Sequence, residues 1–233
     1  MRSDMNYVFP PAPQASLAVK GSQSRFPVRR IFCVGRNYAE HIREMGNDER
    51  DPPFYFTKPA DAVVENGSTI NYPKATSDLH HEVELVLAIG AAGSDITLDD
   101  ALSHVWGAAV GIDFTRRDLQ SVAKKAGRPW DMAKGFDQSA PIGALVPMVQ
   151  LGDLTTGRIA LSVNDENRQT GDLSEMIWPA ADCVAHLSTL VDLAPGDLIM
   201  TGTPAGVSAV GRGDQMVAQI DGMPPLSVSI AAS

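Results

Sequence analysis

The predicted fold depends on the segment Leu79–Gly90, which has the sequence LHHEVELVLAIG. From Val83 onward every second residue is a large apolar one, which is the pattern of a β-strand. Successive side chains on a strand point to opposite faces, so Glu82 and Glu84 project from the same face, about 7 Å apart. That face becomes apolar at Val86, so the two carboxylates lead into a buried surface.

A third carboxylate, Asp113, follows a second apolar segment, Val105–Ile112, which we predict to be a buried strand. Close carboxylates repel each other unless a cation lies between them, and three together suit Mg²⁺ or Mn²⁺, which prefer oxygen ligands. The alternative is that Glu82 and Glu84 mark the solvated end of a strand and that Asp113 caps the helix predicted over 114–125. No Cys/His ligand pattern indicates zinc.

Composition limits the kinds of partner that we expect. The 233 residues are 44% hydrophobic and carry a formal net charge of −9. This charge argues against nucleic acid or an anionic membrane, although a bound divalent cation can still attract an anionic small molecule. Cys33 and Cys183 form no disulfide framework and are predicted to be small buried residues. No signal peptide and no membrane-spanning apolar stretch is visible, so we expect a cytoplasmic enzyme.

The order of the predicted elements indicates a mostly β, α+β fold of many short strands and few helices. We expect an N-terminal arm over residues 1–27 and a single catalytic domain over residues 28–233. The pair Asn164-Asp165 predicts a hairpin between residues 158 and 171. The other predicted elements are strands at 28–35, 52–59, 69–73, 198–201, 215–220 and 226–230, helices at 37–46, 97–104 and 179–193, and a loop at 128–137.

Two further segments carry groups that can act in catalysis or in anion binding. His41 and Glu44 are spaced i, i+3 on the short helix at 37–46, where a carboxylate beside an imidazole makes a general base for water. A solvent-facing polar helix is the alternative. The glycine-flanked segment Gly202–Val207 (GTPAGV) can offer backbone N–H groups and a hydroxyl to an anion, but these residues also suit any tight turn.

Three basic side chains lie near these segments in the sequence. Lys58 can reach a site from its strand, but we expect it to lie at the surface. His80 and His81 precede the carboxylates and can support them or lie at the rim of the site, and we predict that neither is a metal ligand.

Five motifs in this chain resemble, in the same order, those of the fumarylacetoacetate hydrolase family. They are GRNYAEH (Gly35–His41), HHEVE (His80–Glu84), DFTRRDLQ (Asp113–Gln120), WDMAK (Trp130–Lys134) with the nearby Phe136-Asp137, and TGTPAGV (Thr201–Val207). Each motif alone is a weak signal, but five in order are specific, and they cover the chain from about Ile31 to Gly213. The opening RFPVRRIFCVG (Arg25–Gly35) and the pair Pro129-Trp130 are similar to the small bacterial fumarylpyruvate hydrolases of that family.

The resemblance implies the fold of the family's C-terminal domain, in which mixed, rolled β-sheets form a homodimer. It implies Glu82, Glu84 and Asp113 as ligands of Mg²⁺, with Mn²⁺ as the alternative ion, and His41 with Glu44 as the catalytic dyad that activates water. The residues that it implies as contacts of the substrate or of its developing negative charge are Arg117, Gln120, Lys134 and Thr203, with Lys134 also catalytic. The long N-terminal domain of the larger animal members is not seen in this sequence, so their additional metal-ligand position has no clear match.

The activity implied by the resemblance is metal-dependent hydrolysis of the C–C bond of a 2,4-dioxo acid, or acylpyruvate. Fumarylpyruvate, cleaved to fumarate and pyruvate in gentisate-type aromatic catabolism, is the preferred substrate, and the metal acts as a Lewis acid for the departing enolate. Three alternatives within the family are another acylpyruvase, an oxaloacetate decarboxylase, which needs no attacking water, and a 2-oxo acid isomerase. A non-catalytic binding protein of the same fold would lack ligand or dyad residues, and all of them are present here.

Overall fold

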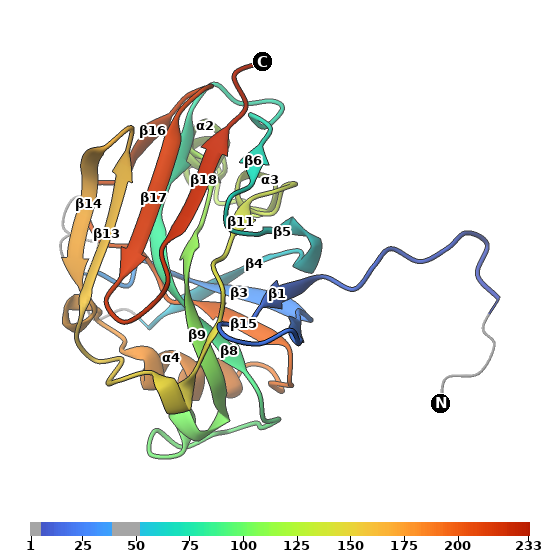
Figure 1. Cartoon of the computed structure of the whole chain (residues 1–233), viewed down its shortest axis with the longest axis vertical. Coiled ribbons are helices and arrows are strands. Elements are labelled where there is room, and N and C mark those ends of the chain that lie inside the picture. The colour runs from blue at the N-terminus through green and yellow to red at the C-terminus, as the bar shows by residue number, and fades with distance from the viewer. Residues whose placement is uncertain (1–5, 39–51) are drawn as a thin grey trace.

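The computed structural model describes residues 6–38 and 52–233. Two large sheets carry most of the fold and enclose the main core between them (Figure 1). The six-stranded sheet has the order β12 (Val146–Pro147), β9 (Val105–Ile112), β8 (Val83–Ile89), β15 (Asp197–Met200), β3 (Arg30–Gly35), β4 (Phe54–Lys58). The five-stranded sheet has the order β14 (Glu166–Asp172), β13 (Arg158–Val163), β17 (Gln215–Ile220), β18 (Leu226–Ile230), β6 (Thr69–Ile70). Within these two sheets, neighbouring strands are antiparallel except in the pairs β15–β3 and β18–β6.

Smaller sheets and short helices make up the rest of the described elements. The small sheets are β10 (Thr115–Arg116), β7 (Leu79–His81) and β16 (Ser208–Val210); β11 (Ala140–Pro141) with β5 (Val63–Val64); and β1 (Ser16–Ala18) with β2 (Arg25–Pro27). The α-helices are α2 (Arg117–Lys125), α3 (Asp131–Lys134) and α4 (Ala180–Ser188), and the 3₁₀ helices are η1 (Ala60–Ala62), η2 (Ala101–His104), η3 (Met148–Gln150) and η4 (Leu173–Glu175). None of the described helices has the length and apolar character needed to cross a membrane.

Strand β8 separates two apolar cores, because its side chains alternate between the two faces of the six-stranded sheet. Leu85 and Leu87 belong to the main core, together with residues of the five-stranded sheet and of helix α4. Val86 and Ala88 belong to a second core, which also contains Leu17 from β1. All residues of β8 are buried, so the predicted strand pattern is confirmed and both faces of β8 are fixed by packing.

The single strand predicted over 79–90 is in fact two strands in different sheets. β7 pairs with β10 and β16, whereas β8 pairs with β9 and β15. Glu82 lies between them, outside both strands. The prediction was wrong here because both strands obey the same alternation, and only their pairing partners reveal the break.

The predicted hairpin is confirmed, and its turn has the backbone that the sequence requires. β13 and β14 pair directly on either side of Asn164 and Asp165. Their φ angles are 51° and 66°, which are the two left-handed positions of a type I′ turn.

The helices differ from their predicted extents. The helix expected over 114–125 begins only at Arg117, because Thr115–Arg116 form β10 and pair with β7. The loop expected over 128–137 contains α3. The helices predicted over 97–104 and 179–193 are shorter in the structure, where they are η2 and α4.

Residues 6–27 contain both exposed and buried parts. Tyr7, Val8 and Phe9 are largely exposed, on a segment that runs away from the sheets in Figure 1. Leu17 and Phe26, on β1 and β2, are buried in the second core. The arm boundary at residue 27 remains a prediction.

We expect Leu85→Ala to lower the free energy of unfolding by about 2–5 kcal/mol, because Leu85 is fully buried in the main core and its truncation leaves a cavity. Urea unfolding followed by circular dichroism measures the change. Val149→Ala, at a side chain that is 93% exposed, is the control and should change stability by less than about 0.5 kcal/mol. Equal effects of the two substitutions would contradict the assignment of the main core.

Candidate metal and substrate site

The antiparallel pairing of β8 with β9 brings the three predicted carboxylates together. Glu84 lies opposite Gly111, and beyond the strand ends the backbone N–H of Asp113 donates to the carbonyl of Glu82 over 2.8 Å. Residues opposite each other in such a pair project to the same face. The ligand atoms of Glu82, Glu84 and Asp113 all lie within 4.8 Å of one another, and all three residues are buried. We call these three residues the carboxylate cluster.

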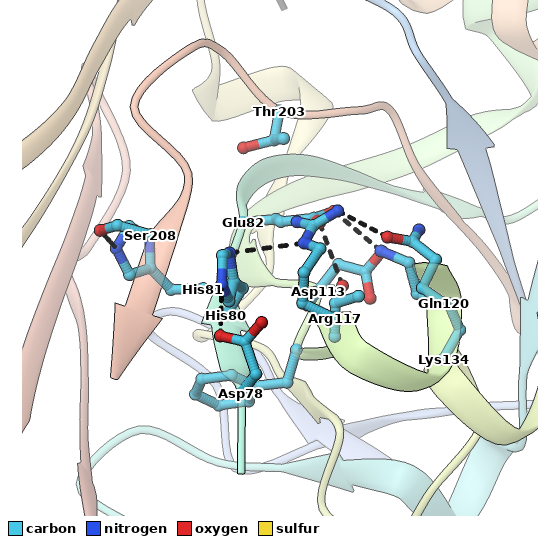
Figure 2. A network of polar contacts seen from close by, with 12 residues as sticks. Asp78, His80, His81, Glu82, Asp113, Arg117, Gln120, Lys134, Thr203 and Ser208 are labelled. Carbon is cyan, nitrogen blue, oxygen red and sulfur yellow. Dashed lines mark hydrogen bonds and ion pairs between the residues drawn. The ribbon is translucent and has the colours of Figure 1, made fainter. Parts of the chain in front are cut away.

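Lys134, at the end of α3, bridges two members of the carboxylate cluster (Figure 2). Its ammonium nitrogen lies 2.8 Å from Glu82 Oε2 and 2.6 Å from Asp113 Oδ2. Burial by itself lowers the pKa of a lysine, but Asp113 and Glu82 outweigh burial and raise the pKa of Lys134. Lys134 is therefore a charged partner of the cluster rather than a proton acceptor.

Lys58, on β4, also belongs to this site, although we predicted it at the surface. It is only 2% exposed, and its ammonium nitrogen lies 2.8 Å from Asp113 Oδ1. It donates hydrogen bonds to the backbone carbonyls of Phe114, over 3.0 Å, and Lys134. The prediction was wrong because a lysine that ends a short strand gives no sign in the sequence of what the strand will pack against.

Arg117 and Gln120 approach the cluster from helix α2. Arg117 Nη2 lies 2.5 Å from Glu82 Oε1, and Nη1 donates to Gln120 Oε1, also over 2.5 Å (Figure 2). The spacing i, i+3 puts both side chains on one face of the helix. Thr115 adds a hydrogen bond to Glu82 Oε1 over 3.1 Å. Two of the predicted substrate contacts therefore lie directly beside the cluster.

His80 contacts Arg117 and is not part of the cluster. Arg117 Nε donates to His80 Nδ1 over 3.4 Å, and His80 Nε2 lies 2.9 Å from Asp78 Oδ1 (Figure 2). Because Arg117 Nε can only donate, His80 Nδ1 accepts and Nε2 carries the proton that faces Asp78.

Among the three carboxylates of the cluster, Glu84 has the fewest described partners to balance its negative charge. Its Oε2 accepts a hydrogen bond from the Gly202 N–H over 2.8 Å, and within residues 6–38 and 52–233 it forms no ion pair. Burial, followed by the charges of Asp113 and Glu82, raises the pKa of Glu84 well above its usual range. A divalent cation among the three carboxylates would remove this cost, so the residues present fit Mg²⁺ or Mn²⁺.

The segment Gly202–Val207 contacts the carboxylate cluster through its first residue, Gly202. The sequence left open whether this segment binds an anion or is only a tight turn, and the anion that the Gly202 N–H binds is the protein's own Glu84. Gly202 has a φ of +96°, and a Cβ there would lie 2.7 Å from Asn37 Cβ, so both the backbone and the space require glycine. Thr203 follows it and is 4% exposed.

Asn37, the first residue of the helix predicted over 37–46, has a side chain that binds two other segments of the chain. The amide nitrogen donates to the carbonyls of Trp178, over 2.8 Å, and Thr201, over 2.7 Å. The amide oxygen accepts from the Trp178 N–H over 2.7 Å. Asn37 thus joins the end of β3 to the segment that carries Gly202.

Gln169 is a buried residue near the site that the sequence did not reveal. It lies on β14, among exposed polar residues, and is completely buried. Its side chain contacts His81, which is also completely buried, and Thr203. Burial lowers the pKa of His81 to about 4. No pattern in the sequence distinguishes Gln169 from its exposed neighbours.

The predicted dyad of His41 and Glu44 lies outside the described residues. The described segments on either side are β3 with Arg36 and β4, and both contribute to the cavity at the cluster. The role of the dyad therefore remains a prediction.

One cavity contains the carboxylate cluster together with all four predicted substrate contacts. Its lining residues are Val34, Gly35, Arg36, Phe56, Glu82, Glu84, Asp113, Arg117, Gln120, Trp130, Lys134, Gly202 and Thr203. Two of them, Phe56 and Trp130, have ring centroids 5.9 Å apart and form an aromatic wall. The arrangement can hold a divalent cation and, beside it, an anionic ligand with an apolar part.

The chain is similar to known proteins over most of its length. Residues 30–231 match the family model described as fumarylacetoacetate (FAA) hydrolase C-terminal. The chain is 44% identical over 177 residues to the fumarylpyruvate hydrolase of a Ralstonia species, covering 76% of this chain and 92% of that protein. It is 40% identical over 205 residues to the mitochondrial oxaloacetate tautomerase of Rattus norvegicus, covering 88% and 93%.

A solved structure gives the same result for the fold. The crystal structure of fumarylpyruvate hydrolase from Pseudomonas aeruginosa, in complex with Mn²⁺ and pyruvate, matches with a TM-score of 0.94 at 52% identity, covering 98% of this chain and 100% of that one. The predicted mostly β fold with mixed sheets and short helices is confirmed. The chain belongs to the fumarylacetoacetate hydrolase family.

Proposed function

We propose that this protein is a metal-dependent hydrolase that cleaves the C–C bond of a 2,4-dioxo acid, with fumarylpyruvate as substrate and fumarate and pyruvate as products. The observation that carries the proposal is the cavity in which the buried carboxylate cluster lies beside Arg117, Gln120 and Lys134. Membership of the family and 44% identity to a fumarylpyruvate hydrolase support it.

The formal charges around the cavity favour a substrate with two carboxylates. Three cationic side chains, Lys58, Lys134 and Arg117, face the three carboxylates. The charges of these six side chains cancel, so a divalent cation bound among them adds a formal charge of about +2. Arg36 also lines the cavity. Fumarylpyruvate carries two carboxylates and complements this charge, whereas an acylpyruvate with an alkyl tail carries only one.

Glu82, Glu84 and Asp113 would hold Mg²⁺, with Mn²⁺ as the alternative, and the bound ion would supply Lewis-acid stabilisation of the enolate oxygen of pyruvate. The protein's own residues would supply the remaining chemistry. His41, oriented by Glu44, takes a proton from water, whose oxygen attacks the 4-carbonyl carbon. The bond between C3 and C4 breaks, its electron pair forms the enolate of pyruvate, and a proton returns to C3.

The four side chains that line the cavity beside the cluster would position the substrate. Lys134 and Arg117 offer positive charge to its oxygen atoms, and Gln120 and Thr203 offer hydrogen bonds. They come from three parts of the chain, namely α2, α3 and the segment Gly202–Val207. Arg117 and Lys134 contact Glu82 directly, so the substrate oxygens would be held close to the cation site.

A second candidate reaction is favoured by a specific relative. The oxaloacetate tautomerase from Rattus norvegicus is 40% identical to this chain. Oxaloacetate also carries two carboxylates, and its tautomerisation passes through the same kind of enolate without an attacking water. Decarboxylation of oxaloacetate requires the same stabilisation, so both reactions belong in any assay of this protein.

We expect His41→Ala to lower the turnover of fumarylpyruvate by about 10²–10⁴-fold, because a positioned general base typically contributes that much. The assay compares fumarylpyruvate, acetylpyruvate and oxaloacetate with added Mg²⁺, and follows loss of the dioxo acid and formation of pyruvate. Binding of Mg²⁺, measured by calorimetry, should be unchanged, since His41 is not among the proposed ligands.

His104→Ala is the matched control, because this histidine does not line the cavity. Unchanged turnover in His41→Ala would exclude the proposed base. A wild-type enzyme that enolises or decarboxylates oxaloacetate but leaves fumarylpyruvate intact would replace the proposed reaction by the second candidate.

Glu84→Gln should weaken the binding of Mn²⁺ by at least about tenfold, because an amide oxygen replaces a charged ligand of the proposed cation. Calorimetric titration of the metal-free protein measures the affinity. Glu166→Gln, at an exposed glutamate on β14, is the control for the loss of one negative charge. Equal affinities of the two variants would remove Glu84 from the ligand set.

Lys134→Met should lower turnover by about 10²-fold while leaving the cation site able to bind metal. Removal of this ammonium leaves Glu82 and Asp113 without a shared cationic partner, so the metal-free variant should unfold at a lower temperature than wild type. Added Mn²⁺ should therefore raise the melting temperature of Lys134→Met more than that of wild type. Lys124→Met is the control, and a Mn²⁺ effect no larger than in that control would contradict the bridging role.

A cytoplasmic location and a homodimer complete the proposal. The first follows from the sequence and the second from the family resemblance. Cell fractionation and sedimentation equilibrium test them.

A further inference from the structure

Gln169 has an amide whose orientation the protein fixes. Its Oε1 accepts a hydrogen bond from the Val83 N–H over 3.0 Å, and its Nε2 donates to the carbonyl of Pro204 over 2.9 Å. A backbone N–H can only donate and a carbonyl can only accept, so the reverse orientation of the amide would lose both hydrogen bonds. The side chain is fully buried, where such a loss is costly.

This orientation determines the tautomer of His81. His81 Nδ1 lies 2.8 Å from Gln169 Oε1, which is an acceptor, so Nδ1 carries the proton. In a neutral imidazole Nε2 then accepts, and its neighbour at 2.9 Å is the hydroxyl of Ser208, which donates. His81 and Val83 thus both donate to the same amide oxygen and hold it in place.

The same orientation determines the direction of the Thr203 hydroxyl. Gln169 Nε2 donates its second proton to Thr203 Oγ1 over 2.8 Å, so this oxygen is an acceptor in the contact. The Thr203 hydroxyl donates to no other described residue, and Thr203 lines the cavity beside the carboxylate cluster. Its proton is therefore available to a ligand in the cavity.

The loop that carries Thr203 is packed tightly on the strand that carries Gln169. A Cβ on Gly206 would lie 2.2 Å from the carbonyl oxygen of Arg168, and a Cβ on Gly171 would lie 2.7 Å from Pro204 Cβ. These close approaches leave the loop little freedom to move relative to β14. The hydrogen bond from Gln169 to Thr203 is therefore held by the surrounding packing.

We propose that Gln169, held by His81 and Val83, is a positioning residue that makes Thr203 a hydrogen-bond donor to an anionic substrate oxygen. The inference rests on the proposed function for the substrate class, a 2-oxo acid, and it assigns roles to two buried residues that lie behind the cavity wall. A donor fixed in this way needs no reorientation when negative charge develops on the substrate.

Four variants test the direction of the hydroxyl. Thr203→Val removes the hydroxyl and keeps the shape, and Thr203→Ser restores it. Gln169→Glu keeps an oxygen for His81 and Val83 but replaces the donor by a second acceptor, so the Thr203 proton must turn away from the cavity. The double variant Gln169→Glu/Thr203→Val completes the cycle. Asn167→Asp, with the same amide-to-acid change on β14 at an exposed position, is the control for added charge.

The probe is pyruvate in the presence of Mn²⁺, whose binding is measured by calorimetry, and kcat and KM for fumarylpyruvate are measured alongside. Thr203→Val and Gln169→Glu should each weaken pyruvate binding by about tenfold, the loss expected for a hydrogen bond to a charged group. The affinity of the double variant for pyruvate should lie within about threefold of the affinity of either single variant. Asn167→Asp should stay within about threefold of wild type. Thr203→Ser, which keeps the hydroxyl, should bind pyruvate more tightly than Thr203→Val.

In turnover, Thr203→Val and Gln169→Glu should lower kcat more than they raise KM, because a donor to developing charge acts mainly in the transition state. The proposal would be overturned if the loss of pyruvate affinity in the double variant equalled the product of the two single losses. It would also be overturned if Gln169→Glu bound pyruvate as tightly as Asn167→Asp does. If Gln169→Glu does not fold by circular dichroism, Gln169→Met, which removes the donor to Thr203, takes its place, and a pyruvate affinity equal to that of Asn167→Asp would then overturn the proposal.

The outcomes separate this proposal from the proposed function. Pyruvate binding requires no turnover, so a wild-type protein that binds pyruvate but hydrolyses no dioxo acid disproves the reaction and still tests the role of Gln169. Hydrolysis of fumarylpyruvate by a Gln169→Glu variant with wild-type kcat and pyruvate affinity would confirm the reaction and disprove the positioning role.

Discussion

Three carboxylates lie within 4.8 Å of one another in the interior of this protein, and the structure around them depends on supplying positive charge there. Buried charges without partners cost several kcal/mol each, so such a cluster exists only where cations are packed against it. Lys58 comes from β4, Lys134 from α3 and Arg117 from α2. The packing of these three elements is therefore tied to the charge balance of the site.

The scaffold keeps this arrangement rigid. β8 lies between two apolar cores, and its pairing with β9 places Glu82 beside Asp113. Gly111 lies opposite Glu84, and a Cβ at this glycine would lie 2.5 Å from a methyl carbon of Val86, so the sheet tolerates only glycine there. A cluster fixed by the central strands of a sheet is held more precisely than one carried on loops.

The distribution of charge explains how an acidic protein can bind an anionic substrate. The whole chain has a formal net charge of −9, yet four basic side chains lie at the cavity or against its carboxylates, namely Arg36, Lys58, Arg117 and Lys134. A bound divalent cation would make this part of the protein positive while the outer surface stays negative. The part of the site nearest the cluster would recognise the 2-oxo acid end that hydrolase, tautomerase and decarboxylase substrates share. The aromatic wall of Phe56 and Trp130 lines the same cavity, and the Phe56 ring centroid lies 4.8 Å from Lys134 Nζ.

The sequence by itself determined the alternation of the strand and the hairpin at Asn164-Asp165, because these depend on neighbouring residues. It also placed Glu82 and Glu84 close together, whereas the pairing of β8 with β9 brings Asp113 to them. Motif order also identified Arg117, Gln120, Lys134 and Thr203, which the structure places around one cavity. Lys58 was misplaced, and Gln169 was not recognised. Both lie on strands whose local sequence says nothing of their partners. The burial of Lys58 is decided by contacts with Asp113 and Phe114, more than 50 residues away along the chain.

The break in the strand at Glu82 has the same origin. Leu79–His81 and Val83–Ile89 follow one alternation, but they pair with different strands and belong to different sheets. Local sequence encodes which face of a strand is apolar, since that depends on the side chains alone. The pairing partners, the charges that meet in the interior and the direction of the Thr203 hydroxyl arise only when distant segments pack together, so the tertiary structure alone decided them.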